Sequence, residues 1–304
     1  MQALMESVPN FSEGRRMEVV EAIVDAARSV SAVTVLDRHS DADHNRTVLT
    51  LVGPPEPLQA AVFRAVEKAT DLIDLREHQG AHPRVGATDV VPFIPLSGTT
   101  MADAIEAARS LGHRVADTLH IPVYFYEEAA TNPERQNLER IRRKGFEELR
   151  DEIATAEDRV PDLGPRSVHE SAGAIVIGAR GPLIAYNIYL NTTDVRIAKR
   201  IARTVRNSSG GLRYVKALGI DMPDRGQVQV SMNLTDFHKT AIHTVFNLVR
   251  DEAEAYGVSV GESEIVGLVP LAALAQAVRY YLRLHEFHDD QILELKLLDA
   301  LESE

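Results

Sequence analysis

One order of predicted elements, strand, helix, strand, strand, helix, strand, occurs twice along this chain of 304 residues. Helices are indicated by apolar residues at helical spacing, and strands by short runs rich in β-branched residues. Ile197, Ile201 and Val205, for example, share one face of a predicted helix. The predicted strands are 4–8, 32–37, 47–52 and 90–94 in the first copy and 183–190, 214–220, 227–234 and 258–266 in the second, and the predicted helices are 16–28, 57–73, 194–206 and 238–256.

This order is typical of ferredoxin-like (βαββαβ) subdomains, in which helices cover one face of an antiparallel sheet. The other face of each sheet must also be covered, and the simplest solution packs the two sheets against each other. We therefore expect an α+β fold with α/β/β/α layers and a cleft between two subdomains, residues 1–180 and 181–304. A helix at 101–119, a strand at 123–126 and a charged helical stretch to residue 154 extend the first copy.

Composition narrows the class of protein. The formal net charge of −12 argues against non-specific binding to nucleic acid or to an anionic membrane. The chain has no cysteine, which excludes disulfides and thiolate nucleophiles and agrees with a reducing compartment. The first residues do not resemble a signal peptide, and no apolar run reaches the roughly 20 residues that span a bilayer. We expect a cytoplasmic protein.

A loop rich in glycine and proline carries His82, Arg84 and Asp89 to the start of an apolar strand. Catalytic groups are concentrated in loops that a rigid scaffold holds in place. A histidine exchanges protons near neutral pH because its ordinary pKa is roughly 6.5. An arginine binds a carboxylate through two parallel hydrogen bonds. These three side chains are therefore the candidate catalytic residues.

The turn between the first strand and the first helix offers a second polar group. Asn10 and Glu13 stand near a helix start, where such side chains cap the helix. The free N–H groups of a helix start also bind anions. Helix capping and substrate binding both remain open for these two residues.

The richest polar stretch is the connection between the second and third strands. It places two aspartates between His39 and His44, and these residue types ligate divalent metals. A metal-dependent hydrolase is therefore an alternative function, although the spacing matches no standard ligand motif. The other interpretation is that this connection, with Asn45 and Arg46 at its end, contributes polar contacts to the cleft.

Two further segments are candidates for substrate binding. One is a basic stretch in which Arg213 and Lys216 follow a Gly-Gly turn and enter a strand, placed to hold a polycarboxylate. The other is a loop bounded by glycine and proline, and ligand sites favour such loops at domain interfaces. This loop consists of Gly164, Pro165, Arg166, Ser167, Val168, His169, Glu170, Ser171, Ala172 and Gly173.

Several motifs carry a resemblance to a known family. They are Val8-Pro-Asn-Phe-Ser-Glu-Gly14, Asn45-Arg-Thr, Gln79-Gly-Ala-His82-Pro-Arg84-Val-Gly-Ala-Thr-Asp89-Val and Pro92-Phe-Ile-Pro95. With them the chain closely resembles glutamate formimidoyltransferase, which also forms the N-terminal part of the bifunctional formimidoyltransferase–cyclodeaminase. Shorter matches extend the resemblance through both halves. The family fold is likewise two ferredoxin-like halves.

The resemblance implies transfer of the formimidoyl group from N-formimidoyl-L-glutamate to N5 of tetrahydrofolate, in histidine degradation and one-carbon metabolism. It implies His82 as the acid–base residue and the loop of residues 164–173 as a folate contact. Tetrahydrofolate is then a co-substrate, and no metal or redox cofactor is expected. The family also suggests a homodimer. Because 304 residues leave no room for a cyclodeaminase domain, that step is expected from a separate protein.

The candidate residues suit this chemistry. N5 attacks the amidinium carbon and the glutamate nitrogen leaves, so one histidine can move a proton from the first nitrogen to the second. We expect Arg84 to hold a substrate carboxylate, and Asp89 or Glu13 to stabilise the cationic amidinium or to orient His82. Natural folates often carry polyglutamate tails, and Arg213 and Lys216 are placed to meet one.

Three alternatives stay open from the sequence. The first is an enzyme of the same fold that uses 5-formyltetrahydrofolate. The second is the metal-dependent hydrolase built on the His39–His44 cluster, and the third is a folate-binding protein without catalysis. The acidic C-terminal stretch, residues 289–304, is interpreted either as a partner surface or as a solvated end.

Overall fold

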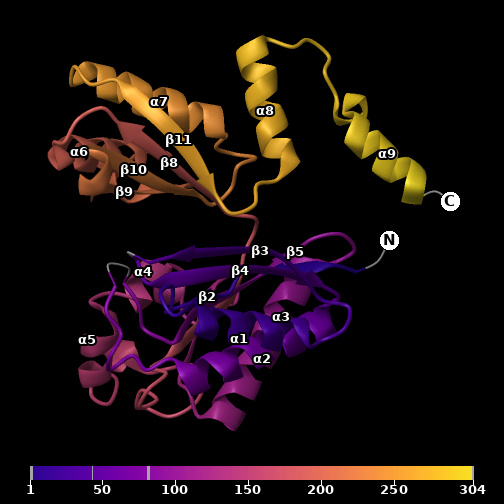
Figure 1. The fold of residues 1–304 in the computed structure, drawn as a ribbon, viewed down its shortest axis with the longest axis vertical. Coiled ribbons are helices and arrows are strands. Elements are labelled where there is room, and N and C mark those ends of the chain that lie inside the picture. Colours follow the sequence, from indigo (N-terminus) through magenta and orange to yellow (C-terminus); the bar gives the residue numbers. More distant parts are fainter. Residues whose placement is uncertain (1–2, 43, 81–82, 303–304) are drawn as a thin grey trace. The chain divides into compact units, whose positions relative to one another are not determined.

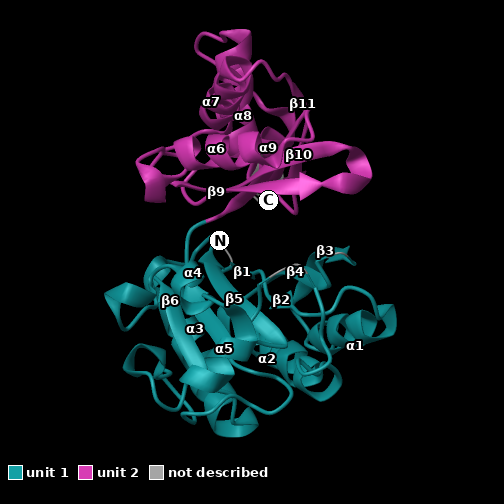
Figure 2. Ribbon diagram, turned by 90° about the vertical axis from the view of Figure 1, so that its left-hand side faces the viewer, with its two compact units in different colours: residues 1–181 teal, residues 182–304 magenta. Residues whose placement is uncertain are grey.

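The computed structural model describes residues 3–42, 44–80 and 83–302, and the chain divides into two compact units, residues 1–181 and 182–304 (Figure 2). Each unit has its own sheet, its own helices and its own apolar core. No helix within the described ranges is both long and apolar enough to cross a membrane.

The sheet of the first unit has, over the residues described, seven strands (Figure 1). Strands β1 and β2 are two parts of one interrupted strand, and both pair antiparallel with β4 on one side and β5 on the other. With β3 beyond β4, this part has the antiparallel ferredoxin-like order, as predicted. Strand β7 then pairs parallel with β5, and β6 parallel with β7. The strands are β1 (Met5–Ser7), β2 (Asn10–Phe11), β3 (Thr34–Asp41), β4 (Arg46–Gly53), β5 (Thr88–Pro95), β6 (Val123–Glu127) and β7 (Ile175–Ala179).

Helices cover both faces of this sheet. Three amphipathic helices bury one stripe each, and Ile23, Val62 and Leu111 enter the larger core with the strands. A smaller core on the other face joins Leu149 to strand residues such as Tyr124. The helices are α1 (Met17–Arg28), α2 (Pro55–Leu72), α3 (Met101–Leu119), α4 (Leu138–Ile141) and α5 (Gly145–Glu152).

The second unit repeats the ferredoxin-like order with four antiparallel strands, β11-β8-β10-β9, among its described residues. Alternate residues such as Ile188 and Val230 face the core, as the period of two in a strand requires. Asp194 caps α6 as predicted, because its carboxylate accepts a hydrogen bond from the backbone N–H of Arg196 at 2.9 Å. The elements are β8 (Ile184–Leu190), α6 (Val195–Val205), β9 (Val215–Met222), β10 (Gln227–Leu234), α7 (Ile242–Ala255), β11 (Val260–Val266), α8 (Leu271–Leu282) and α9 (Leu293–Glu302).

Short 3₁₀ helices join these elements. They are η1 (Pro133–Arg135), η2 (Glu157–Arg159), η3 (Asn207–Ser209), η4 (Pro223–Arg225) and η5 (Asp289–Gln291). The last two stretches of the chain, α8 and α9, bury little apolar surface and leave several leucines exposed, among them Leu282 and Leu293.

The α+β class and both ferredoxin-like orders are confirmed, while several predicted boundaries were wrong. Helix α7 begins at Ile242, four residues after the predicted start. Strand β3 continues to Asp41, because its last residues pair with the start of β4. Helix α2 begins at Pro55, two residues before the predicted start. The charged stretch to residue 154 is broken into α4 and α5, since Lys144 and Gly145 adopt positive φ angles of 62° and 79°. Face-to-face packing of the two sheets stays a prediction.

Candidate functional site

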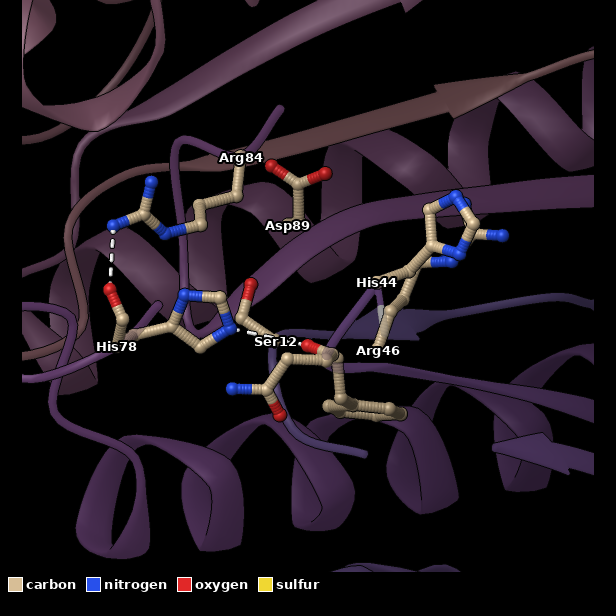
Figure 3. Close-up of a pocket in the computed structure, with 8 residues that line it drawn as sticks. Ser12, His44, Arg46, His78, Arg84 and Asp89 are labelled. Atoms are coloured by element: carbon tan, nitrogen blue, oxygen red, sulfur yellow. Dashed lines mark hydrogen bonds between the residues drawn. The ribbon is translucent and has the colours of Figure 1, made fainter. Parts of the chain in front are cut away.

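Three segments of the first unit meet at a polar pocket (Figure 3). They are the residues at and after β2, the turn between β3 and β4, and the loop between α2 and β5. The pocket is lined by Phe11, Ser12, His44, Asn45, Arg46, His78, Arg84 and Asp89. A second pocket of about 240 Å³ adjoins it and is lined by Ser12, Glu13, Arg15, Arg16, Asn45, Ile73, Asp74, Glu77 and His78. The two pockets therefore share a wall made of Ser12, Asn45 and His78.

Asn45 ties the three segments together. Its side-chain oxygen accepts a hydrogen bond from the backbone N–H of Gly14 at 2.9 Å, and its amide donates to the carbonyl of Gln79 at 2.9 Å. Its backbone has a φ angle of +48°, in the left-handed region that asparagine tolerates better than most residues. Asn45, a predicted substrate-binding residue, thus joins the segments that form the pocket.

The loop after α2 packs tightly on the β3–β4 turn at Gly80. A Cβ atom added there would lie 2.5 Å from the carbonyl oxygen of His44, which is closer than real Cβ contacts. Only glycine fits this approach of two backbones. This close contact fixes the distance between the loop and the β3–β4 turn, and we expect it to position His78, two residues earlier.

His78 stands in the shared wall, and the sequence analysis did not single it out. Its Nε2 lies 3.0 Å from the backbone carbonyl oxygen of Asn45. Its Nδ1 is buried and has no hydrogen-bond partner among the described residues. Burial lowers the pKa of His78 below its ordinary value, the bond to Asn45 opposes this shift, and the nearby Arg84 adds to it.

Arg84 contacts the backbone of His78 and is mostly buried, with 13% of its side chain exposed. Its Nη2 donates to the carbonyl of His78 at 3.0 Å and to the carboxylate of Glu147, on α5, at 2.9 Å. Its Nε–H is buried and has no partner within the described part of the chain. The predicted carboxylate-binding arginine therefore already holds one carboxylate of the protein.

Asp89 is almost fully buried, with 4% of its side chain exposed, and forms an ion pair with Arg142. Its Oδ1 also accepts a hydrogen bond from the backbone N–H of Val85 at 2.7 Å. Asp89 thus fixes the start of β5 and balances a buried cation. Burial and, to a smaller extent, the neighbouring Arg142 lower the pKa of Arg46, while the carboxylates of Asp89 and Asp41 oppose this shift.

Glu13 and Asn10 flank the pocket residues Phe11 and Ser12 in the sequence and differ in what they do. Glu13 accepts hydrogen bonds from the backbone N–H groups of Arg15 and Arg16, both at 2.9 Å, just before α1 begins. Burial alone would raise the pKa of Glu13, but these bonds and the Arg16 guanidinium hold it below its ordinary value. Asn10 does not cap the helix, because its amide donates to the carbonyl of Val8 at 3.0 Å.

The predicted folate loop is divided by the fold. Its second part lies beside the loop that follows α2: Leu75 donates to the carbonyl of Ser171 at 2.8 Å, and Ala87 to that of Ala172 at 2.9 Å. Arg76 also pairs with Glu170 at 2.5 Å. The first part turns toward η2, where Arg166 pairs with Glu157 at 2.9 Å. Gly164, Pro165, Arg166 and Ser167 are exposed, Val168 packs on the core, and His169 and Gly173 bond each other through their backbones.

The His39–His44 cluster does not converge on one point. His44 and Asp41 form a pair at 2.6 Å, whereas His39 is exposed on β3. Asp43 lies outside the described residues. Within the ranges that the structure describes, no three His, Asp or Glu side chains gather as ligands of one metal ion.

Three further predicted residues, His82, Arg213 and Lys216, are not placed relative to this pocket. His82 lies outside the described residues. Arg213 and Lys216 belong to the second unit, where Arg213 lies 5.6 Å from the ring centre of Tyr214 and Lys216 is on β9 opposite Asn233.

Sequence reasoning missed His78, Arg142 and Glu147. His78 follows a helix with no recognisable motif, and its role depends on a carbonyl 33 positions earlier in the chain. Arg142 and Glu147 come from a charged stretch that reads as a solvated surface. The signal for Glu147 would have been a pairing with Arg84 across 63 residues, which one sequence does not reveal.

Comparisons with known proteins agree with this architecture. The family model described as "Formiminotransferase domain, N-terminal subdomain" matches residues 4–180, and that described as "Formiminotransferase domain" matches residues 185–297. The chain is 43% identical over 299 residues to the glutamate formimidoyltransferase of Streptococcus pyogenes serotype M1, covering 98% of this chain and 100% of that protein. It is 48% identical over 304 residues to the glutamate formimidoyltransferase of Thermoplasma acidophilum, covering 99% and 100%. It is 44% identical over 287 residues to the formimidoyltransferase-cyclodeaminase of Rattus norvegicus, covering 92% of this chain and 53% of that protein.

Proposed function

The chain belongs to the formiminotransferase family, and from this premise we propose how its residues carry out the family's reaction. It is a transferase that moves the formimidoyl group of N-formimidoyl-L-glutamate to N5 of tetrahydrofolate, with L-glutamate and 5-formimidoyltetrahydrofolate as products. Tetrahydrofolate is a co-substrate. The use of a 5-formyltetrahydrofolate donor is not favoured, because the relatives matched along their whole length bear the formimidoyl name.

The observation that supports the residue assignments is the polar pocket in the first unit. Arg46 and Arg84 line it, and Arg142 reaches it through Asp89. A pocket with this excess of guanidinium groups suits a donor that carries two carboxylates. Glu13, Asn45 and Arg46 line this pocket or its neighbour, and with Asn10, which precedes the pocket residue Phe11 on β2, they complete the proposed donor site.

His82 is the proposed acid–base residue. When N5 of tetrahydrofolate attacks the amidinium carbon, N5 must lose a proton, and the departing glutamate nitrogen must gain one. One histidine can accept the proton from N5 and then donate it to the glutamate nitrogen, so no proton is gained or lost overall. Arg84 holds a donor carboxylate during both steps, while Asp89 acts on the site by fixing the loop and Arg142.

Folate is proposed to contact the loop of residues 164–173 and, through a polyglutamate tail, Arg213 and Lys216. The position of Ser171 and Ala172 beside the donor-site loop supports the first contact. The cationic stretch between Asp194 and Asp221 supports the second. We also propose residues 1–180 and 181–304 as the two transferase subdomains.

We propose that the enzyme is a cytoplasmic homodimer that acts in histidine degradation and one-carbon metabolism. The cyclodeaminase step is carried out by a separate protein. Exposed leucines on α8 and α9 support self-association, since large apolar patches mark interaction sites. Sedimentation velocity of wild type and Leu282→Glu would test the dimer.

The test of the function is an assay with both substrates and a chelator, followed by acid, which converts the product to a methenyl form that absorbs in the near ultraviolet. We expect full activity of the wild type with chelator present. His82→Ala should lower kcat by about 10²–10⁴-fold, the usual range for a lost acid–base residue. The folded state of the variant is checked by circular dichroism.

Three results would change the proposal. An inactive wild type would exclude this transfer, and folate binding without turnover would then favour a binding protein. Loss of activity with the chelator would favour the metal-dependent alternative. An active His82→Ala variant would leave the reaction in place and assign the acid–base role to another residue.

A further inference from the structure

Two buried polar atoms of the donor pocket have no partner among the described residues: Nδ1 of His78 and Nε of Arg84. We propose that together they bind the α-nitrogen and the α-carboxylate of the formimidoyl donor. Nδ1 of His78 accepts a hydrogen bond from the N–H on that nitrogen, and Nε–H of Arg84 donates to the carboxylate. This inference rests on the proposed function and names the atoms that recognise its donor.

The hydrogen bond at the other nitrogen of His78 decides which atom carries the proton. The partner of Nε2 is a backbone carbonyl, which only accepts hydrogen bonds. Nε2 must therefore carry the hydrogen, and in the neutral ring Nδ1 is left with a lone pair. The environment keeps the ring neutral, because burial and the cationic Arg84 both disfavour a second proton. Nδ1 is thus a fixed acceptor.

Arg84 provides the complementary donor. Its Nη2 donates to the carbonyl of His78 itself, so the guanidinium is tied to the residue that carries Nδ1. Figure 3 shows the ring edge with Nδ1 turned toward the Arg84 side chain. An acceptor and a donor that are both buried and unpaired have each lost their hydrogen bonds to water without replacement, which destabilises the empty site. A ligand that pairs with both would replace those hydrogen bonds.

N-formimidoyl-L-glutamate has the matching pair of groups on one carbon atom. Its α-carbon bears both the amidine N–H and a carboxylate. A hydrogen-bond donor and an acceptor therefore project from the same carbon atom. The product L-glutamate keeps both groups. Tetrahydrofolate offers no carboxylate next to its reacting nitrogen, and we expect its affinity not to depend on this pair.

Two substitutions of His78 separate a ligand contact from a structural role. Glutamine places its amide near the former Nε2 and can keep donating to Asn45, but it has no acceptor at the Nδ1 position. Asparagine places an oxygen near the former Nδ1 and loses the bond to Asn45. Both variants and Arg84→Lys are assayed in the steady state with two donors. One donor is N-formimidoyl-L-glutamate, and the other is 4-(formimidoylamino)butanoate, which lacks the α-carboxylate. Circular dichroism confirms folding.

We expect His78→Gln to raise KM for the natural donor roughly tenfold or more, and His78→Asn to raise it less. The KM for tetrahydrofolate should stay within about twofold of the wild type in both variants, since this pair is not expected to contact folate. Arg84→Lys should raise KM for the natural donor but leave KM unchanged for the donor that lacks the α-carboxylate. If His78→Asn is the more impaired variant, or if His78→Gln matches the wild type, the inference is wrong. An inactive wild type would instead overturn the proposed function.

Discussion

Arg84 and Glu147 pose the clearest question at the scale of single residues. The Glu147 carboxylate, 57% exposed, holds the guanidinium that is proposed to bind a donor carboxylate. A donor carboxylate at Nε and the Glu147 carboxylate at Nη2 would then share the charge of one cation and repel each other. Such a partly exposed pair contributes little to stability, typically 0.2–1 kcal/mol. We expect the Arg84–Glu147 pair to affect mainly the binding of the donor.

We therefore expect Glu147→Gln to lower KM for the donor about two- to fivefold with little change in melting temperature. The matched control is Glu148→Gln, which makes the same charge change next door but removes a pair with Lys144 at 2.6 Å. Steady-state kinetics and thermal denaturation of the three proteins provide the comparison. A KM that rises in Glu147→Gln would mean that Glu147 helps to position Arg84.

At the scale of elements, the Gly80 contact connects the β3–β4 turn to the loop that carries His78. Gly80→Ala would push the loop away from the His44 carbonyl, because a backbone oxygen cannot yield as a side chain does. We expect kcat/KM for the donor to fall at least tenfold, since a displacement of about 1 Å near reacting groups can cost 10²-fold. Gly181→Ala is the control, because its added Cβ meets nothing within 4 Å.

The elements also show how far the sequence alone reaches. Helices α1, α2 and α6 were predictable because their buried residues recur at helical spacing. The end of β3 was not, because its polar residues resemble a loop and only the pairing with β4 makes them a strand. The motif around Arg84 and Asp89 located the pocket. His78 enters it, and Arg142 pairs with Asp89, only through contacts between distant segments.

At the scale of the whole molecule, the second unit is proposed to hold the folate tail. Tetrahydrofolate with a polyglutamate tail should then have a several-fold lower KM than the monoglutamate, because Arg213 and Lys216 attract the added carboxylates. Lys216→Glu should remove this preference. Lys68→Glu, on α2 of the first unit, makes the same charge change outside this cationic stretch and serves as control. Equal KM values for both folates in the wild type would contradict the tail site.

Strand β7 has a further consequence, for the order in which the protein matures during synthesis. It lies between β5 and β6, yet it is the last strand of its sheet to leave the ribosome. Until residue 179 has emerged, β5 and β6 have no shared neighbour and expose open hydrogen-bonding edges. Such parallel pairing between distant segments forms slowly. The first unit should therefore stay vulnerable to aggregation and proteolysis through most of its own translation, and become resistant only when β7 inserts.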